Sequence, residues 1–124
     1  DFRRIIFNGD LLTFADFNRE HERCLSFLKD AVSCSKARRK IVVTHHVPSF
    51  QMQCPKFADS QANGAFTVEL EDYIKNSGID YWIFGHSHYN VDVKIGNTNC
   101  MSNQLGYVFH GEHESFNPGK YIEV

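Results

Sequence analysis

The sequence predicts an α/β fold with a mixed, partly parallel sheet in one domain. Short β-branched segments alternate with segments whose apolar residues recur every three or four positions, as strands alternate with amphipathic helices. Two alternating segments around Gly96-Asn97 predict a β-hairpin. The chain has 124 residues, of which 42% are hydrophobic and 23% charged, and these values suit a single domain with its own core.

Two elements are expected in the first part of the chain. Residues 3–9 predict a short strand that ends at Asn8-Gly9, and residues 14–35 predict a helix. Asn18 is the expected N-cap, because two glutamates follow it where the helix dipole favours negative charge. The apolar stripe of this helix consists of Phe17, Cys24, Leu25, Leu28 and Val32.

The remaining elements follow from the same patterns. Residues 41–44 and 79–84 are apolar strands, separated by a polar loop over 47–64 and by a helix over 65–78 that Gly78 ends. The loop is longer than ordinary connections, and such loops often serve as lids or binding loops. The later elements are the hairpin over 91–102, a turn over 103–107, a polar loop over 110–119 and a last strand over 120–124.

Composition and charge exclude several classes of function. The net charge is −2 and residues 36–40 are the one basic cluster, so the sequence lacks the excess of basic residues expected of a protein that binds nucleic acid or a membrane surface. No apolar run approaches the ~18–20 residues that a membrane-spanning helix needs. Four cysteines lie scattered without a C-x-x-C pair, so we expect reduced thiols and a cytoplasmic setting. They are Cys24, Cys34, Cys54 and Cys100.

Histidines follow two of the predicted strands at matching positions. Thr44-His45-His46 ends the first strand, and Gly85-His86-Ser87-His88 ends the second. Because ligands of α/β sheets bind at the carboxyl ends of parallel strands, these imidazoles are expected to converge at one edge. A single histidine at a strand end is more often a hydrogen-bonded loop residue, but two such pairs favour a metal site. Gly85 is expected to give the backbone the freedom that the turn needs.

These motifs carry a resemblance to a known family. The segments "VVTHHVPS" and "IFGHSHYN" resemble the two C-terminal signature motifs of the calcineurin-like metallophosphoesterases, and "NCMSNQLGY" resembles the segment that follows them. The resemblance runs from about Phe2 to Val124. It implies that residues 1–124 form the C-terminal half of a four-layer α/β/β/α sandwich, with a dinuclear metal centre that hydrolyses phosphomonoesters or phosphodiesters.

The resemblance also implies roles for individual histidines. His45 and His86 resemble ligands of the second metal, and His88 resembles a ligand of the first. His46 aligns with a position that is not a consistent ligand, so we place it behind the ligands or facing the substrate, as the candidate catalytic residue. The implied cofactors are two divalent ions, Mn, Fe or Zn. The implied partner is a small phosphate ester.

Other motifs of the family are missing from this chain. They are Asp-x-His, Gly-Asp-x-x-Asp and Gly-Asn-His-Asp/Glu, which supply the remaining ligands and the carboxylate that bridges the metals. Gly9-Asp10 does not match, because Asp16 is not at the motif spacing, and a turn before a helix explains the pair better. We therefore expect a chain entered partway through a domain, with weak metal affinity and negligible hydrolysis alone.

Rival interpretations remain open at this stage. The first rival interpretation is a non-catalytic scaffold of the same family that binds a protein partner. A structural zinc site with Cys54 is less favoured, because such sites usually hold paired cysteines. Two groups of residues have two interpretations each. His110 and His113, with Glu112 and Glu114, form either a small site or a solvated loop, and Phe50, Met52 and Phe57 line either a pocket or the core. Asn103 and Tyr107 are expected to shape the floor of the site.

Overall fold

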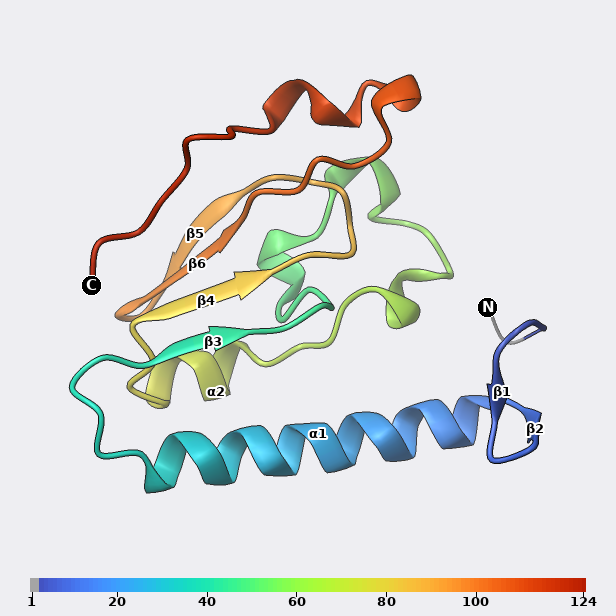
Figure 1. The fold of residues 1–124 in the computed structure, drawn as a ribbon, viewed down its shortest axis with the longest axis horizontal. Helices are drawn as coiled ribbons and strands as arrows, with labels where there is room; N and C mark the ends of the chain where they lie inside the picture. The colour runs from blue at the N-terminus through green and yellow to red at the C-terminus, as the bar shows by residue number, and fades with distance from the viewer. Residues whose placement is uncertain (1–2) are drawn as a thin grey trace. The chain divides into compact units, whose positions relative to one another are not determined.

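The computed structural model describes residues 3–124, which form two compact units. The first unit ends at Lys36, and the second is Ala37–Val124. Figure 1 shows a long helix in the first unit and a sheet in the second. Each unit has its own secondary structure and is described by itself.

The first unit begins with a small hairpin. Strands β1 (Ile6–Phe7) and β2 (Asp10–Leu11) pair antiparallel, with Phe7 opposite Asp10. Asn8 and Gly9 form the turn and have φ values of 52° and 94°. Hairpin turns of type I′ require positive φ at both central positions, which Asn-Gly supplies. The strand predicted over 3–9 is therefore shorter than expected, and Gly9-Asp10 belongs to this turn and to β2.

Helix α1 (Phe14–Cys34) follows, and its N-cap differs from the prediction. Thr13 caps the helix through a capping box: its hydroxyl accepts from the Asp16 backbone N–H at 3.1 Å, and the Asp16 carboxylate accepts from the Thr13 N–H at 3.1 Å. These bonds satisfy two orphan donors of the first turn, so the helix begins before Asn18. The Thr13 hydrogen bonds also lower the pKa of Asp16. Of the predicted stripe, Val32 is buried and Cys24 is exposed.

The second unit is built on a mixed four-stranded sheet, as predicted. The strands are β3 (Ile41–Val43), β4 (Tyr81–Phe84), β5 (Asp92–Ile95) and β6 (Thr98–Ser102), in the order β3-β4-β6-β5. Strands β3, β4 and β6 run parallel, and β5 pairs antiparallel with β6 in the predicted hairpin. Figure 1 shows β3 and β4 side by side with their carboxyl ends on the same side.

Two predicted elements of the second unit are wrong in extent. Helix α2 (Glu71–Asn76) is much shorter than residues 65–78, because Thr67 forms a parallel bridge to Val47 and is removed from the helix. Gly78, with φ 68°, follows the helix as its left-handed stop. Residues 120–124 form no strand, and the Glu123 carbonyl instead accepts from the Tyr81 hydroxyl at 3.1 Å.

The core lies on one face of the sheet. Val42, Trp82 and Cys100 occupy one row across β3, β4 and β6, and all three are buried. Helix α2 covers this face, since its Ile74 is fully buried and the adjacent Tyr73 ring meets Trp82 edge-on at 6.4 Å. The alternating burial of β4 and β6 gives these strands one defined register.

The four cysteines of the described chain are free thiols. Cys24 and Cys34 are exposed, whereas Cys100 is buried and its desolvation raises the pKa of its thiol to about 11. Among residues 3–124 no helix combines the length and the apolar character required to cross a bilayer.

A hydrogen bond between two strands gives a test of this core. The buried Trp82 indole donates to the Thr44 hydroxyl at 3.0 Å. Replacement Thr44→Val leaves the indole N–H unpaired, so we expect the free energy of unfolding to fall by about 1–3 kcal/mol. Urea denaturation followed by the fluorescence of Trp82, the sole tryptophan, measures this change. Thr44→Ser keeps the hydroxyl and serves as control. Equal stability of Thr44→Val and wild type would contradict the assignment.

Candidate functional site

The ends of β3 and β4 bring three of the predicted histidines to one place. The strands pair in parallel as far as Val43 opposite Ile83, and the pairing continues through a hydrogen bond from Gly85 N–H to the His45 carbonyl at 3.1 Å. His45 Nε2 and His86 Nδ1 are consequently 2.9 Å apart. The two imidazoles, separated by 41 positions in the sequence, are direct neighbours at the carboxyl edge of the sheet.

His46 packs beside this pair. Its ring centroid lies 5.4 Å from that of His45 and 4.7 Å from that of His86. The adjacent cavity is lined by His45, His86 and His88 among other residues, and His46 is not one of them. The structure therefore places His46 against the other rings.

Residues 85–88, here called the histidine turn, have an unusual backbone. His86 and His88 adopt φ values of 68° and 51°, in the left-handed region that residues with a side chain seldom occupy. Gly85, in contrast, has no positive φ, and a Cβ at this position would make ordinary contacts with the His45 carbonyl oxygen at 3.6 Å and with Gln104 at 3.8 Å. The expected conformational freedom of Gly85 is not used. The strain lies on the two histidines, as it often does at functional sites.

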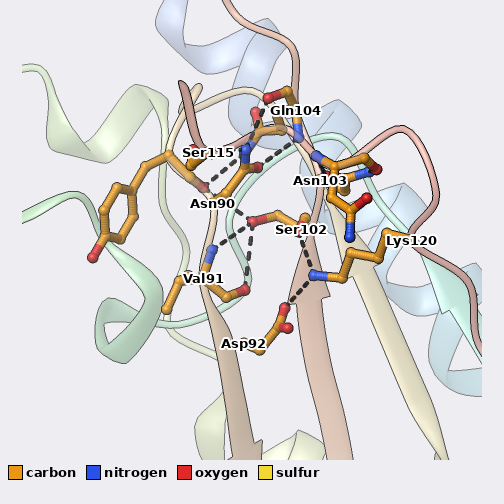
Figure 2. Close-up of polar contacts among 10 residues, drawn as sticks. Asn90, Val91, Asp92, Ser102, Asn103, Gln104, Ser115 and Lys120 are labelled. Carbon is orange, nitrogen blue, oxygen red and sulfur yellow. Dashed lines mark hydrogen bonds and ion pairs between the residues drawn. The ribbon is translucent and has the colours of Figure 1, made fainter. Parts of the chain in front are cut away.

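Gln104 holds the histidine turn in this conformation. Its Oε1 accepts from the His88 backbone N–H at 2.9 Å, and its Nε2 donates to the Tyr89 carbonyl at 3.0 Å and to the Ser87 hydroxyl at 3.3 Å. Asn90 in turn accepts from the Gln104 N–H at 2.5 Å and donates to the Gln104 carbonyl at 2.9 Å. Figure 2 shows this reciprocal pair of bonds, with Asn90 also reaching Ser115.

Of the two residues predicted to form the floor of the site, one lies at the site and the other does not. Asn103 exchanges two hydrogen bonds with the Asn117 backbone, at 2.8 and 2.9 Å, and so holds the C-terminal segment. Tyr107 does lie at the site, with its ring edge-on to His88 at 4.7 Å. The sequence analysis missed Gln104, although it directly follows Asn103. Its signal was its place just after a strand that runs beside β4.

Glu112, which the sequence analysis grouped with His110 and His113, lies instead against His88. Its Oε2 lies 2.8 Å from His88 Nδ1 and accepts from the Tyr107 backbone N–H at 2.6 Å. The bond from Tyr107, followed by that from His88, lowers the pKa of the carboxyl group, so Glu112 is ionised at neutral pH. A separate small site with His110 and His113 is not formed, because Glu112 joins the histidine turn instead. His110 and His113 are exposed.

A cavity of about 550 Å³ opens beside these histidines. Part of the long loop forms its wall, with Phe57 and Asn63 among the lining residues, and Tyr107 and Glu112 come from the C-terminal segment. Phe66 also lines it, and its ring lies 4.5 Å from that of His86. Of the loop residues with two interpretations, Phe57 lines the cavity, Met52 is fully buried and Phe50 is exposed. The size suits a small organic molecule.

The electrostatics favour neutral imidazole. Desolvation, followed by repulsion from His46, His45 and His88, lowers the pKa of His86 from its ordinary value of 6.5 to about 4. His86 therefore carries a lone pair at pH 7, which is the form that binds metal ions.

The donor set fits part of a metal centre. Two nitrogen ligands of one tetrahedral ion, at ~2.1 Å each, lie ~3.4 Å apart. The 2.9 Å between His45 Nε2 and His86 Nδ1 is a hydrogen bond between the two rings, and sharing an ion would require these nitrogens to separate by only ~0.5 Å. Within residues 3–124, however, no three histidine, cysteine or acidic side chains form a group ready to hold an ion. Cys54 lines the same cavity without completing such a group.

Comparisons with known proteins add three findings. The family model described as calcineurin-like phosphoesterase matches residues 4–90, which is more than half of the chain. An uncharacterized protein of Acanthamoeba polyphaga mimivirus is 29% identical over 120 residues. That alignment covers 91% of this chain and 41% of the viral protein, so the chain spans less than half of its relative's length. No solved structure matches the chain significantly.

The shifted pKa of His86 gives a test by titration. We expect the imidazole proton signal of His86 to titrate near pH 4 in the metal-free chain, followed by NMR and assigned by its absence in His86→Gln. Between pH 6.5 and about 4 the unfolded chain takes up a proton that the folded chain does not. The contribution of His86 to stability is therefore complete above pH 6.5 and declines as the pH falls through this interval. A midpoint near 6.5 would contradict the burial described above.

Proposed function

The chain belongs to the calcineurin-like phosphoesterase family, and we propose that it is the C-terminal portion of a metal-dependent phosphoesterase. The observation that carries this proposal is the 2.9 Å approach of His45 Nε2 and His86 Nδ1 at the ends of two adjacent parallel strands. The order of the two histidine motifs, which resembles that of the family's C-terminal motifs, supports the placement within the domain.

In this proposal the histidines divide between two ions. His45 and His86 bind one ion, and His88, oriented by its neighbours, binds the other. Imidazole ligands suit Zn, Fe or Mn, and we propose two such divalent ions as cofactors. When bound, the pair of ions lowers the pKa of a water molecule and neutralises charge on the phosphate oxygens. Asp and Glu ligands from another part of the protein complete both sites.

The other residues at the site have supporting roles. His46 positions His86, since the two ring centroids are 4.7 Å apart. Gln104 holds the histidine turn through two hydrogen bonds, to His88 and Ser87, and a third to the adjacent Tyr89. Phe57, Phe66 and Tyr107 line the cavity, where they would contact the organic part of a phosphate ester. The aromatic walls exclude water from that part of the substrate, which strengthens polar interactions at the phosphate.

The metal assignment is tested by binding of the metal alone. We expect His86→Ala to weaken Zn²⁺ binding by the chain about tenfold or more, which corresponds to ~1.4 kcal/mol or more, because one of two paired nitrogen ligands is lost. Isothermal titration calorimetry measures the change. His113→Ala removes an exposed histidine of the C-terminal segment and is the matched control. Equal affinity in His86→Ala and wild type would contradict the assignment and favour a scaffold without a metal site.

Catalysis by the 124 residues alone gives a separate prediction. We expect negligible hydrolysis of bis(p-nitrophenyl) phosphate in the presence of Mn²⁺. The reason is charge: the described site holds histidines, which supply no negative charge as ligands, and one carboxylate, whereas two divalent ions need further anionic ligands. Release of p-nitrophenol is followed by absorbance, with His86→Ala as background. Robust manganese-dependent turnover by the wild-type chain, absent from the variant, would show that no further ligands are needed.

A further inference from the structure

We propose that Glu112 is a positioning residue that fixes the tautomer of His88 and thereby selects the ring nitrogen that binds metal. The effect on the His88 tautomer is inferred from geometry alone, whereas the selection of the metal-binding nitrogen also rests on the proposed function. Glu112 Oε2 is 2.8 Å from His88 Nδ1, with the side chains about one third exposed.

The hydrogen-bond inventory of the two groups determines the tautomer. An ionised carboxylate accepts and never donates, so the proton shared at this contact belongs to His88 Nδ1. A neutral imidazole carries one N–H, which leaves Nε2 as the nitrogen with a free lone pair. His88 lines the cavity beside His45 and His86. The free lone pair therefore belongs to a ring at the proposed metal centre.

The carboxylate is itself held from a second side. The Tyr107 backbone N–H donates to the same Oε2 at 2.6 Å, and the Tyr107 ring packs edge-on against His88 at 4.7 Å. These two contacts fix the carboxylate and the imidazole relative to each other. Such a carboxylate–histidine pair typically changes metal affinity by 10–100-fold when it is removed.

Gly106 permits the close approach of the two residues. It has a φ of 62°, and a Cβ at this position would lie 2.6 Å from Glu112 Cβ, 2.8 Å from Glu112 Oε2 and 3.3 Å from His88 Cβ. Both the backbone conformation and the space therefore require glycine. A chance contact between an exposed loop and a histidine would not need a residue of this kind.

The contributing segment also lies outside the matched part of the family. The family model ends at residue 90, whereas Gly106, Tyr107 and Glu112 follow it. The two motifs supply the nitrogen ligands, and the later segment supplies the group that orients one of them. This division separates the new role from the roles that the resemblance implies.

The test reads the tautomer of His88 in the metal-free chain by long-range ¹H–¹⁵N NMR at pH 8. We expect the Nδ1–H form in wild type and in Glu112→Gln, whose amide oxygen still accepts. We expect a shift toward the Nε2–H form in Glu112→Ala. Glu114→Ala removes the same charge from the same exposed loop and is the matched control. An unchanged tautomer in Glu112→Ala, or an equal shift in Glu114→Ala, would overturn the proposal.

A second variant and a second measurement keep the outcome clear. Glu112→Asp keeps the charge and withdraws the carboxylate by one methylene group, so it should shift the tautomer even where Glu112→Ala unfolds.

Zn²⁺ affinity should fall about tenfold or more in Glu112→Ala and less in Glu112→Gln. Absence of Zn²⁺ binding by wild type would refute the proposed function, while the tautomer of His88 would still test the role of Glu112. Equal Zn²⁺ affinity of wild type and Glu112→Ala would overturn the metal-selecting role.

Discussion

The parallel pairing of β3 with β4 is the constraint on which the site depends. Hydrogen bonds from Thr44 N–H to the Ile83 carbonyl and from Gly85 N–H to the His45 carbonyl extend this pairing to the strand tips, at 2.9 and 3.1 Å. The buried Trp82 side chain of β4 also bonds to Thr44, at the end of β3. Because this pairing fixes the backbone register, it brings His45 and His86 together at the ends of the two strands. The candidate site is thus held on the same paired strands as the core, which is the kind of support that a metal site requires.

The histidine turn shows how local strain is offset. Two left-handed histidines within three positions cost about 1–3 kcal/mol each, and the surrounding hydrogen bonds must exceed that cost. Gln104, Asn90 and Ser102 supply them, with Ser102 bonding both the Tyr89 carbonyl and the Val91 N–H. Ser102 ends β6, the strand beside β4. The segment that follows β4 is therefore held by hydrogen bonds from the end of β6 as well as by its pairing with the end of β3.

The sequence predicted what repeats and missed what is irregular. Alternating apolar residues predicted the sheet and its hairpin, and the parallel-strand rule predicted the convergence of the histidines. Thr13-x-x-Asp16 was a readable capping box that the nearby glutamates obscured. Residues 120–124 look like a strand, but a strand exists only where a neighbouring edge pairs with it. Glu112 lies 24 positions from His88 in short 3₁₀ turns, and no periodic pattern links such residues.

Charge explains why, in the proposed function, the described residues alone would form an incomplete metal centre. Histidine ligands contribute lone pairs but no negative charge, and the low pKa of His86 keeps that ring neutral at pH 7. Glu112 contributes its charge to His88 and to the Tyr107 N–H. Two divalent ions brought to this edge would therefore remain largely uncompensated, which favours weak binding.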